Sequence, residues 1–418
     1  MRSRTWIALL ILAIFASFTF TYLYSKSLQQ TTTITVTKTT SITVSLKETE
    51  VDHEYEEVVK DILKGVMGWV ESHRGLRFKE KVEVVVLTKE WVIQHWGIGF
   101  LNRTEVQLEE RLLKALFIIP EDFNLTKFKV SRSGYTVAAS AGNKIYVVKG
   151  LFDPRDKKDA GAVLAHELTH VLQGEYFKIP EPTRRDEEQA ISALVEGDAD
   201  LMASHYLLEN WGTYKKGFSE SYFDPLIALW LFPYIHGKPF IEYVYKKEGW
   251  SGVNSLYEDP PRSTAETLHP EKYLNGWRPI NISSPISRES GWRLVMQDTL
   301  GEYFIRQMLR AHLPGDVANR SAEGWCGDLI QLYEKEGGYV VKWRIAWEAG
   351  AEADEFLESF QSLLKEVGAI RTSNNLWKTD VETIEIQVFG NETLITIISP
   401  PTELSNEHVE ALAQPAAT

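Results

Sequence analysis

The sequence is poor in cysteine and in positive charge. Cys326 is the only cysteine among 418 residues, so no disulfide can form within the chain and its core must be stable without one. A lone cysteine between Trp325 and Gly327 indicates packing rather than a nucleophile. Lys and Arg number 45 against 58 Asp and Glu, which gives a net charge of −13. Such acidity argues against nucleic acid as a partner.

An apolar or hydroxylic run occupies residues 6–24, directly after Arg2 and Arg4. Its 19 residues are close to the length that crosses a bilayer. The arginines favour a cytoplasmic N-terminus at residues 1–5, with the bulk of the chain outside. A cleaved secretory signal is the alternative, but the run is long for one and no clear cleavage site follows it. We therefore expect a single-pass membrane anchor, with the soluble part extracytoplasmic.

Residues 25–50 are rich in threonine and predict an extended stalk between the anchor and the soluble part. Five N-x-[ST] sequons, which weakly support an outside location, occur at Asn102, Asn124, Asn281, Asn319 and Asn391. We expect one domain over residues 51–370, followed by a C-terminal β-hairpin and loose tail over residues 371–418.

The hydrophobic periodicity predicts an α+β fold that is mainly helical, with a small mixed sheet. One predicted strand, residues 144–148, precedes the helix expected around residues 161–172. It is interpreted either as a sheet edge able to hold an extended peptide or as an ordinary core strand. Other expected elements are helices at 55–73, 105–118, 186–209 and 352–367, strands at 82–87 and 339–347, and a hairpin at 383–398.

The pentad His166-Glu167-Leu168-Thr169-His170 is the most specific motif in the chain. On a helix, residues four apart share a face, so His166 and His170 can offer their imidazoles to one ion. Glu167 is rotated by about 100° from His166 and can flank that ion. This arrangement is typical of a zinc hydrolase, with two nitrogen ligands and a carboxylate base beside a bound water.

A catalytic zinc site needs a third ligand, and Glu196 is the best candidate. It lies in the second helical pattern, four residues before Asp200, so the two carboxylates share a face. Asp200 is expected to accept the second N–H of one ligand histidine. Asp198, in the same turn, is the rival ligand.

The pentad with a downstream Glu resembles the gluzincins, metallopeptidases that combine an HExxH helix with a Glu ligand from the next helix. The spacing of Glu196 and Asp200 is similar to the thermolysin-like pattern, although the gap after His170 is longer and the late histidine block of those relatives is missing. Further blocks between residues 55 and 367 resemble a set of membrane-anchored prokaryotic proteins taken to be zinc peptidases. These blocks are residues 144–148, 166–177, 193–199, 232–237, 264–273 and 322–328.

The resemblance implies a zincin-like fold, a Zn²⁺ cofactor and a peptide or protein substrate. Glu167 would act as general base, and a second donor would stabilise the oxyanion. His269 is the first choice for that donor because Pro270 stiffens its loop. The remaining donor candidates are Tyr273, His205, Tyr206, His236 and Tyr234. A non-catalytic, zinc-stabilised extracellular binding module is the alternative function.

Overall fold

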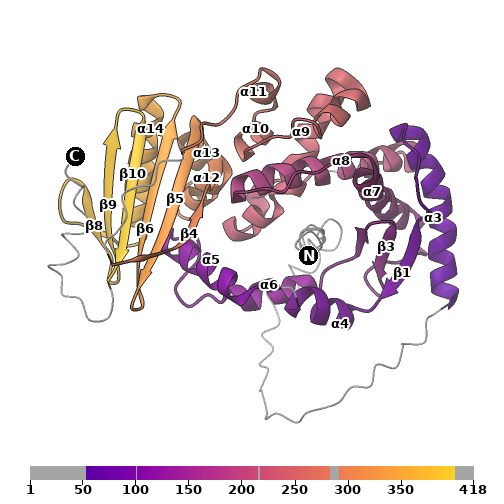
Figure 1. Cartoon of the computed structure of the whole chain (residues 1–418), viewed down its shortest axis with the longest axis horizontal. Coiled ribbons are helices and arrows are strands. Elements are labelled where there is room, and N and C mark those ends of the chain that lie inside the picture. The colour runs from indigo at the N-terminus through magenta and orange to yellow at the C-terminus, as the bar shows by residue number, and fades with distance from the viewer. Residues whose placement is uncertain (1–52, 100, 215–216, 283–290, 401–418) are drawn as a thin grey trace, which may run out of the picture. The chain divides into compact units, whose positions relative to one another are not determined.

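The computed structural model describes residues 53–99, 101–214, 217–282 and 291–400. The chain divides into two compact units. Among the described residues, unit 1 comprises 53–99, 101, 128–177 and 199–214, and unit 2 comprises 102–127, 178–198, 217–282 and 291–400. Helices and sheets occur in both units (Figure 1). The expected α+β class is therefore confirmed.

Unit 1 contains a three-stranded mixed sheet and the helix that carries the HExxH pentad. In the strand order β1-β3-β2, β1 is parallel to β3 and β2 is antiparallel to it. The helix α7 packs against β2 and against α3. The elements are α3 (His53–Arg74), β1 (Glu83–Leu87), α4 (Lys89–Val92), the π-helical η1 (Ile93–Ile98), β2 (Ala138–Ala141), β3 (Lys144–Val148) and α7 (Lys157–Tyr176). Helix α6 (Leu125–Ser133) begins in unit 2 and ends in unit 1.

The strand β3 does not form the edge of this sheet. It pairs with β1 on one side and with β2 on the other, so the expectation of an edge strand at residues 144–148 is wrong and the alternative of a core strand is right. The edge next to α7 is β2, whose sequence Ala-Ala-Ser-Ala lacks the β-branched residues that mark a strand in sequence.

The second helix of the expected pair is α8 (Arg185–Trp211). The division between the units falls inside this continuous helix, between Asp198 and Ala199. In unit 2, α8 packs closely against α9 (Pro225–Ser255), because a Cβ added at Gly197 would overlap the backbone of Gly237. Glycine at position 197 is therefore explained by helix packing.

Unit 2 is built around a seven-stranded sheet in the order β4-β5-β6-β10-β9-β8-β7. Helix α12 contacts β5, and α14 contacts β6, β9 and β10 (Figure 1). The strands are β4 (Arg293–Asp298), β5 (Trp325–Lys335), β6 (Gly338–Trp347), β7 (Ile370–Arg371), β8 (Leu376–Lys378), β9 (Thr383–Phe389) and β10 (Glu392–Ser399). The helices are α5 (Arg103–Ala115), the 3-10 helix η2 (Glu220–Tyr222), α10 (Thr264–Leu268), α11 (Pro270–Leu274), α12 (Gly301–Arg310), α13 (Gly315–Ala322) and α14 (Gly350–Glu366).

The expected C-terminal hairpin is formed by β9 and β10. The strands pair antiparallel, with Phe389 opposite Glu392, and the turn between them contains Gly390 at φ +63°. The hairpin does not stand alone, because β10 also pairs along its length with β6.

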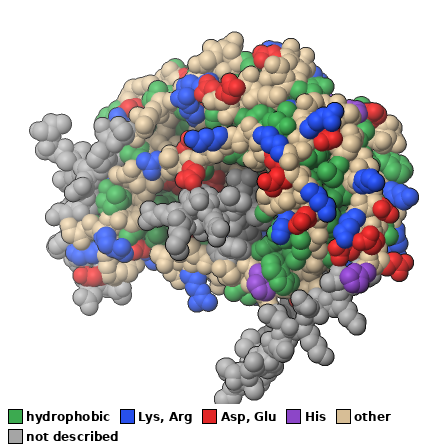
Figure 2. All heavy atoms as spheres, turned by 45° about the vertical axis from the view of Figure 1, so that its right-hand side comes forward, with side chains coloured by type: hydrophobic (Ala, Val, Ile, Leu, Met, Phe, Trp, Pro, Cys, Tyr) green, Lys and Arg blue, Asp and Glu red, His purple; other side chains and the backbone are tan. Residues whose placement is uncertain are grey.

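Within the described ranges, no helix is long and apolar enough to cross a membrane. The anchor expected at residues 6–24, the stalk at residues 25–50 and the tail after residue 400 lie outside the described residues. On the face drawn in Figure 2, basic and acidic side chains are interspersed.

We predict that Gly197→Ala lowers the free energy of unfolding by about 1–3 kcal/mol, because a methyl group there must push two helix backbones apart. Gly68→Ala in α3 is the matched control, since nothing lies within 4 Å of its added Cβ. That change should raise stability by up to about 1 kcal/mol. Chemical denaturation measures both variants. Equal stability of the two variants would refute the close packing of α8 on α9.

Candidate metal centre

Helix α7 is buried over most of its length. The Asp156 side chain caps its first turn by accepting a hydrogen bond from the Asp159 N–H at 3.2 Å. From Ala160 to Gln173, most residues of the helix are buried, including His166 and Glu167. Charged and imidazole side chains are costly in such a setting unless another group compensates for them.

The structure brings together the three expected metal ligands. One ligand atom from each of His166, His170 and Glu196 lies within 4.8 Å of the others. His166 is 8% exposed and Glu196 is 1% exposed. Within the residues that the structure describes, this is the group of three or more His, Cys, Asp or Glu side chains whose spacing suits a metal ion.

The two imidazoles face one another through their Nε2 atoms, which are 3.0 Å apart. Each Nδ1 atom already has an acceptor. His166 Nδ1 lies 3.0 Å from Asp200 Oδ1, and His170 Nδ1 lies 2.7 Å from Gln173 Oε1. These acceptors place the ring proton on Nδ1 in both histidines, which leaves both Nε2 lone pairs directed into one space.

Two lone pairs at this distance repel unless a cation, either a shared proton or a metal ion, lies between them. Two nitrogens bound to one tetrahedral Zn²⁺ at about 2.05 Å would be about 3.3 Å apart, close to the observed separation. Two imidazole nitrogens and one carboxylate form a donor set that suits Zn²⁺ and leaves a fourth position for water. The residues present therefore fit the expected metal.

Family comparisons match two separate parts of the chain. Residues 127–176 match the family model of the eCIS core domain. Residues 292–409 match a domain of unknown function (DUF8575). No curated protein and no solved structure matches the chain. The eCIS core match contains His166 and His170 and ends before Glu196, and the second match lies within unit 2.

Asp198, the rival third ligand, is held by another group. Its Oδ2 atom accepts a hydrogen bond at 2.8 Å from the buried Tyr257 hydroxyl. Asp200, one turn after Glu196, lies against His166 as the helical spacing predicted. Glu167 is 1% exposed and lies in the helix turn between His166 and His170.

The sequence interpretation missed Gln173 and Tyr257. Gln173 lies seven residues after His166 and three after His170, which places all three on one face of α7. This spacing was a usable signal for the partner of His170. No sequence signal pointed to Tyr257 as the partner of Asp198, because the two residues are far apart in the sequence.

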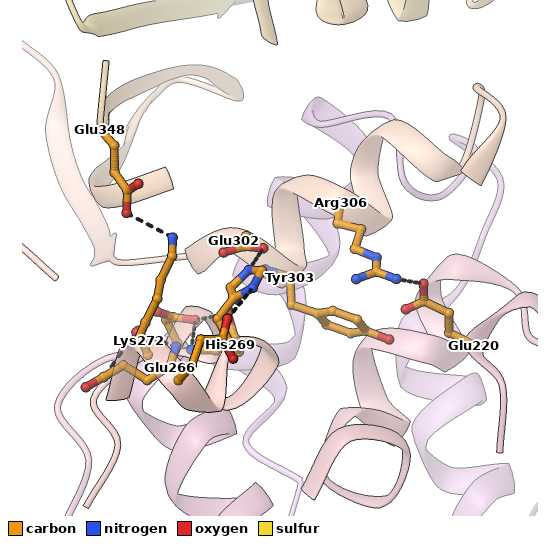
Figure 3. Close-up of polar contacts among 12 residues, drawn as sticks. Glu220, Glu266, His269, Lys272, Glu302, Tyr303, Arg306 and Glu348 are labelled. Carbon is orange, nitrogen blue, oxygen red and sulfur yellow. Dashed lines mark hydrogen bonds and ion pairs between the residues drawn. The ribbon is translucent and has the colours of Figure 1, made fainter. Parts of the chain in front are cut away.

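The structure places His269 in unit 2, between α10 and α11. Its Nε2 atom lies 2.8 Å from Glu302 Oε1 (Figure 3). Hydrogen bonding to Glu302 raises the pKa of His269 above its ordinary value of 6.5. Its imidazole is thus engaged with a carboxylate, and its role as oxyanion donor stays a prediction.

Two of the other candidates for the oxyanion donor, Tyr273 and His236, also have polar contacts with neighbouring residues. The Tyr273 hydroxyl donates to the Asp259 carbonyl at 2.5 Å. His236 lies 3.4 Å from Glu220 Oε2, and burial lowers its pKa. Glu220 also pairs with Arg306 (Figure 3). The remaining candidates are Tyr206, packed against Gly161 and Trp69, the buried Tyr234 and the half-buried His205.

We predict that Glu302→Gln lowers the pKa of His269, as measured by NMR titration. Because the folded-state pKa of His269 is raised, its contribution to stability is complete below the unfolded value and is lost as pH rises through the folded value. Stability should therefore fall less steeply above about pH 6.5 in the variant. Glu271→Gln is the control, because Glu271 is exposed and 4.0 Å from His269 Nδ1. An equal effect of both changes would contradict the assigned pairing.

Proposed function

We propose that the chain is a zinc-dependent peptidase of the gluzincin type, with a zincin-like fold in which His166, His170 and Glu196 hold the metal. The observation that carries this proposal is the convergence of these three side chains, with both histidines oriented through Nδ1. When bound, Zn²⁺ would lower the pKa of a water molecule and polarise a substrate carbonyl.

Glu167 is the general base of the proposed reaction. As the neighbour of His166 on a buried helix, its carboxylate takes a proton from the attacking water and passes it to the departing amine nitrogen. Asp200 keeps the His166 imidazole in the tautomer that presents Nε2.

The substrate class follows from the edge strand beside α7. Strand β2 pairs with β3 on one side, which leaves it at the edge of the sheet, and it contacts α7. An extended peptide can pair with such an edge through main-chain hydrogen bonds. We therefore propose a peptide or protein substrate. From the apolar run at residues 6–24 we propose a membrane anchor and an extracytoplasmic location, and from the net charge of −13 we propose that the chain does not bind nucleic acid.

A zinc-stabilised binding module without catalysis is the second candidate, since the same ligands would hold a structural ion. The carboxylate of Glu167 distinguishes the two functions, because structural zinc has no need of a base.

We predict that His166→Ala lowers the zinc content of the purified protein from near one equivalent to a small fraction, because one of three protein ligands is lost. Metal analysis by mass spectrometry measures this content. His95→Ala is the control, since His95 is exposed and stacks on Trp91. If the wild-type protein carries no zinc after reconstitution, the proposed metal centre is wrong.

We predict that Glu167→Gln keeps stoichiometric zinc and lowers peptide cleavage at least about 100-fold, because the base is removed and the ligands are not. Cleavage of a mixed peptide pool, followed by mass spectrometry with and without chelator, measures the activity. Loss of zinc in this variant would contradict the role of Glu167. Wild-type protein that binds zinc and cleaves no peptide would favour the binding module.

A further inference from the structure

We infer that Gln173 is a positioning residue for the metal centre, which holds His170 in the orientation and tautomer that binds the ion. This inference rests on the proposed function of the three-residue cluster. Gln173 is 1% exposed, and its Oε1 atom lies 2.7 Å from His170 Nδ1. An amide oxygen only accepts hydrogen bonds, so this contact keeps the ring proton on Nδ1 and leaves Nε2 available to the metal.

The two histidines are supported from different helices. His166 depends on Asp200 of α8, which also carries Glu196. His170 depends on Gln173, three residues later on its own helix α7. The spacing of residues 166, 170 and 173 keeps both ligands and this partner on one helix face. The acceptor at His170 Nδ1 therefore comes from its own helix α7, whereas the acceptor at His166 Nδ1 comes from α8.

The charge of the centre explains why a neutral side chain suits this position. Glu167, Glu196 and Asp200 are all buried, so the surroundings of the proposed ion already contain three acidic side chains. A fourth carboxylate at position 173 would also accept from His170, but it would add a buried negative charge. An amide supplies the acceptor without that cost.

The test compares Gln173→Met with Gln173→Glu. Methionine has a similar volume and no acceptor for the ring N–H, so we expect the affinity for zinc to fall about 10- to 100-fold, as for other lost partners of ligand histidines. Glutamate keeps the acceptor, so zinc affinity should stay close to that of the wild type, while the metal-free protein should melt at a lower temperature. Titration with zinc against a competing chelator measures the affinity.

Gln307→Met is the matched control. Gln307 is 0% exposed on α12, and its amide donates to Glu220 at 3.2 Å. The same substitution there should leave zinc affinity unchanged. The absorption bands of the Co²⁺-substituted protein give a second readout, because a reoriented imidazole alters the ligand field. They should change in Gln173→Met and not in Gln307→Met.

If Gln173→Met has the same zinc affinity and the same Co²⁺ absorption as the wild-type protein, the inference is overturned and the proposed function stays intact. An equal loss of affinity in Gln307→Met would also overturn it, since the effect would then be general. If Gln173→Met does not fold, Gln173→Asn takes its place, because the shorter side chain withdraws the acceptor, and the same loss is expected. A wild-type protein that binds neither Zn²⁺ nor Co²⁺ would instead refute the proposed function.

Discussion

The candidate metal centre depends on two imidazole nitrogens that face each other. His166 and His170 direct their Nε2 atoms at each other across 3.0 Å, and each Nδ1 atom is engaged by an acceptor. No neutral arrangement of protons relieves both lone pairs, because the acceptors retain the ring protons on the far side. A buried carboxylate at position 196 adds negative charge to the same space. A small cation between the two Nε2 atoms would relieve their repulsion and offset the carboxylate, which is why this cluster suits a metal ion.

Helix α8 can hold this cluster because its successive residues meet different neighbours. Gly197 packs on the backbone of Gly237, Asp198 binds Tyr257, and Asp200 binds His166. Neighbouring residues on a helix diverge by about 100°, so one stretch can serve several partners. A rotation or slide of α8 that moved Glu196 would also disturb these packing and hydrogen-bond contacts. Two of these contacts, the packing on Gly237 and the hydrogen bond from Tyr257, lie outside the cluster and hold the turn that carries Glu196.

Local spacing made the centre predictable, and long-range pairing limited what could be predicted elsewhere. The i, i+4 pattern placed His166 and His170 on one face, and the same pattern favoured Glu196 over Asp198 through its pairing with Asp200. The seven-stranded sheet was not expected, since the pairing of β6 with β10 is set by register between distant segments. Alanine and serine give no strand signal, so the sequence does not predict β2 and cannot decide whether residues 144–148 form an edge or a core strand.

The eCIS core match ends at residue 176, so it includes the acceptor for His170 and excludes the acceptor for His166. Residues 127–176 supply His166, His170 and Gln173, so His170 has its ligand atom and its acceptor within one helix. Glu196 and Asp200 come from α8, outside that match. A segment limited to α7 contains the Gln173 acceptor and lacks the Asp200 acceptor. The helix after the matched segment therefore supplies both the carboxylate that we propose as third ligand and the acceptor for His166 Nδ1.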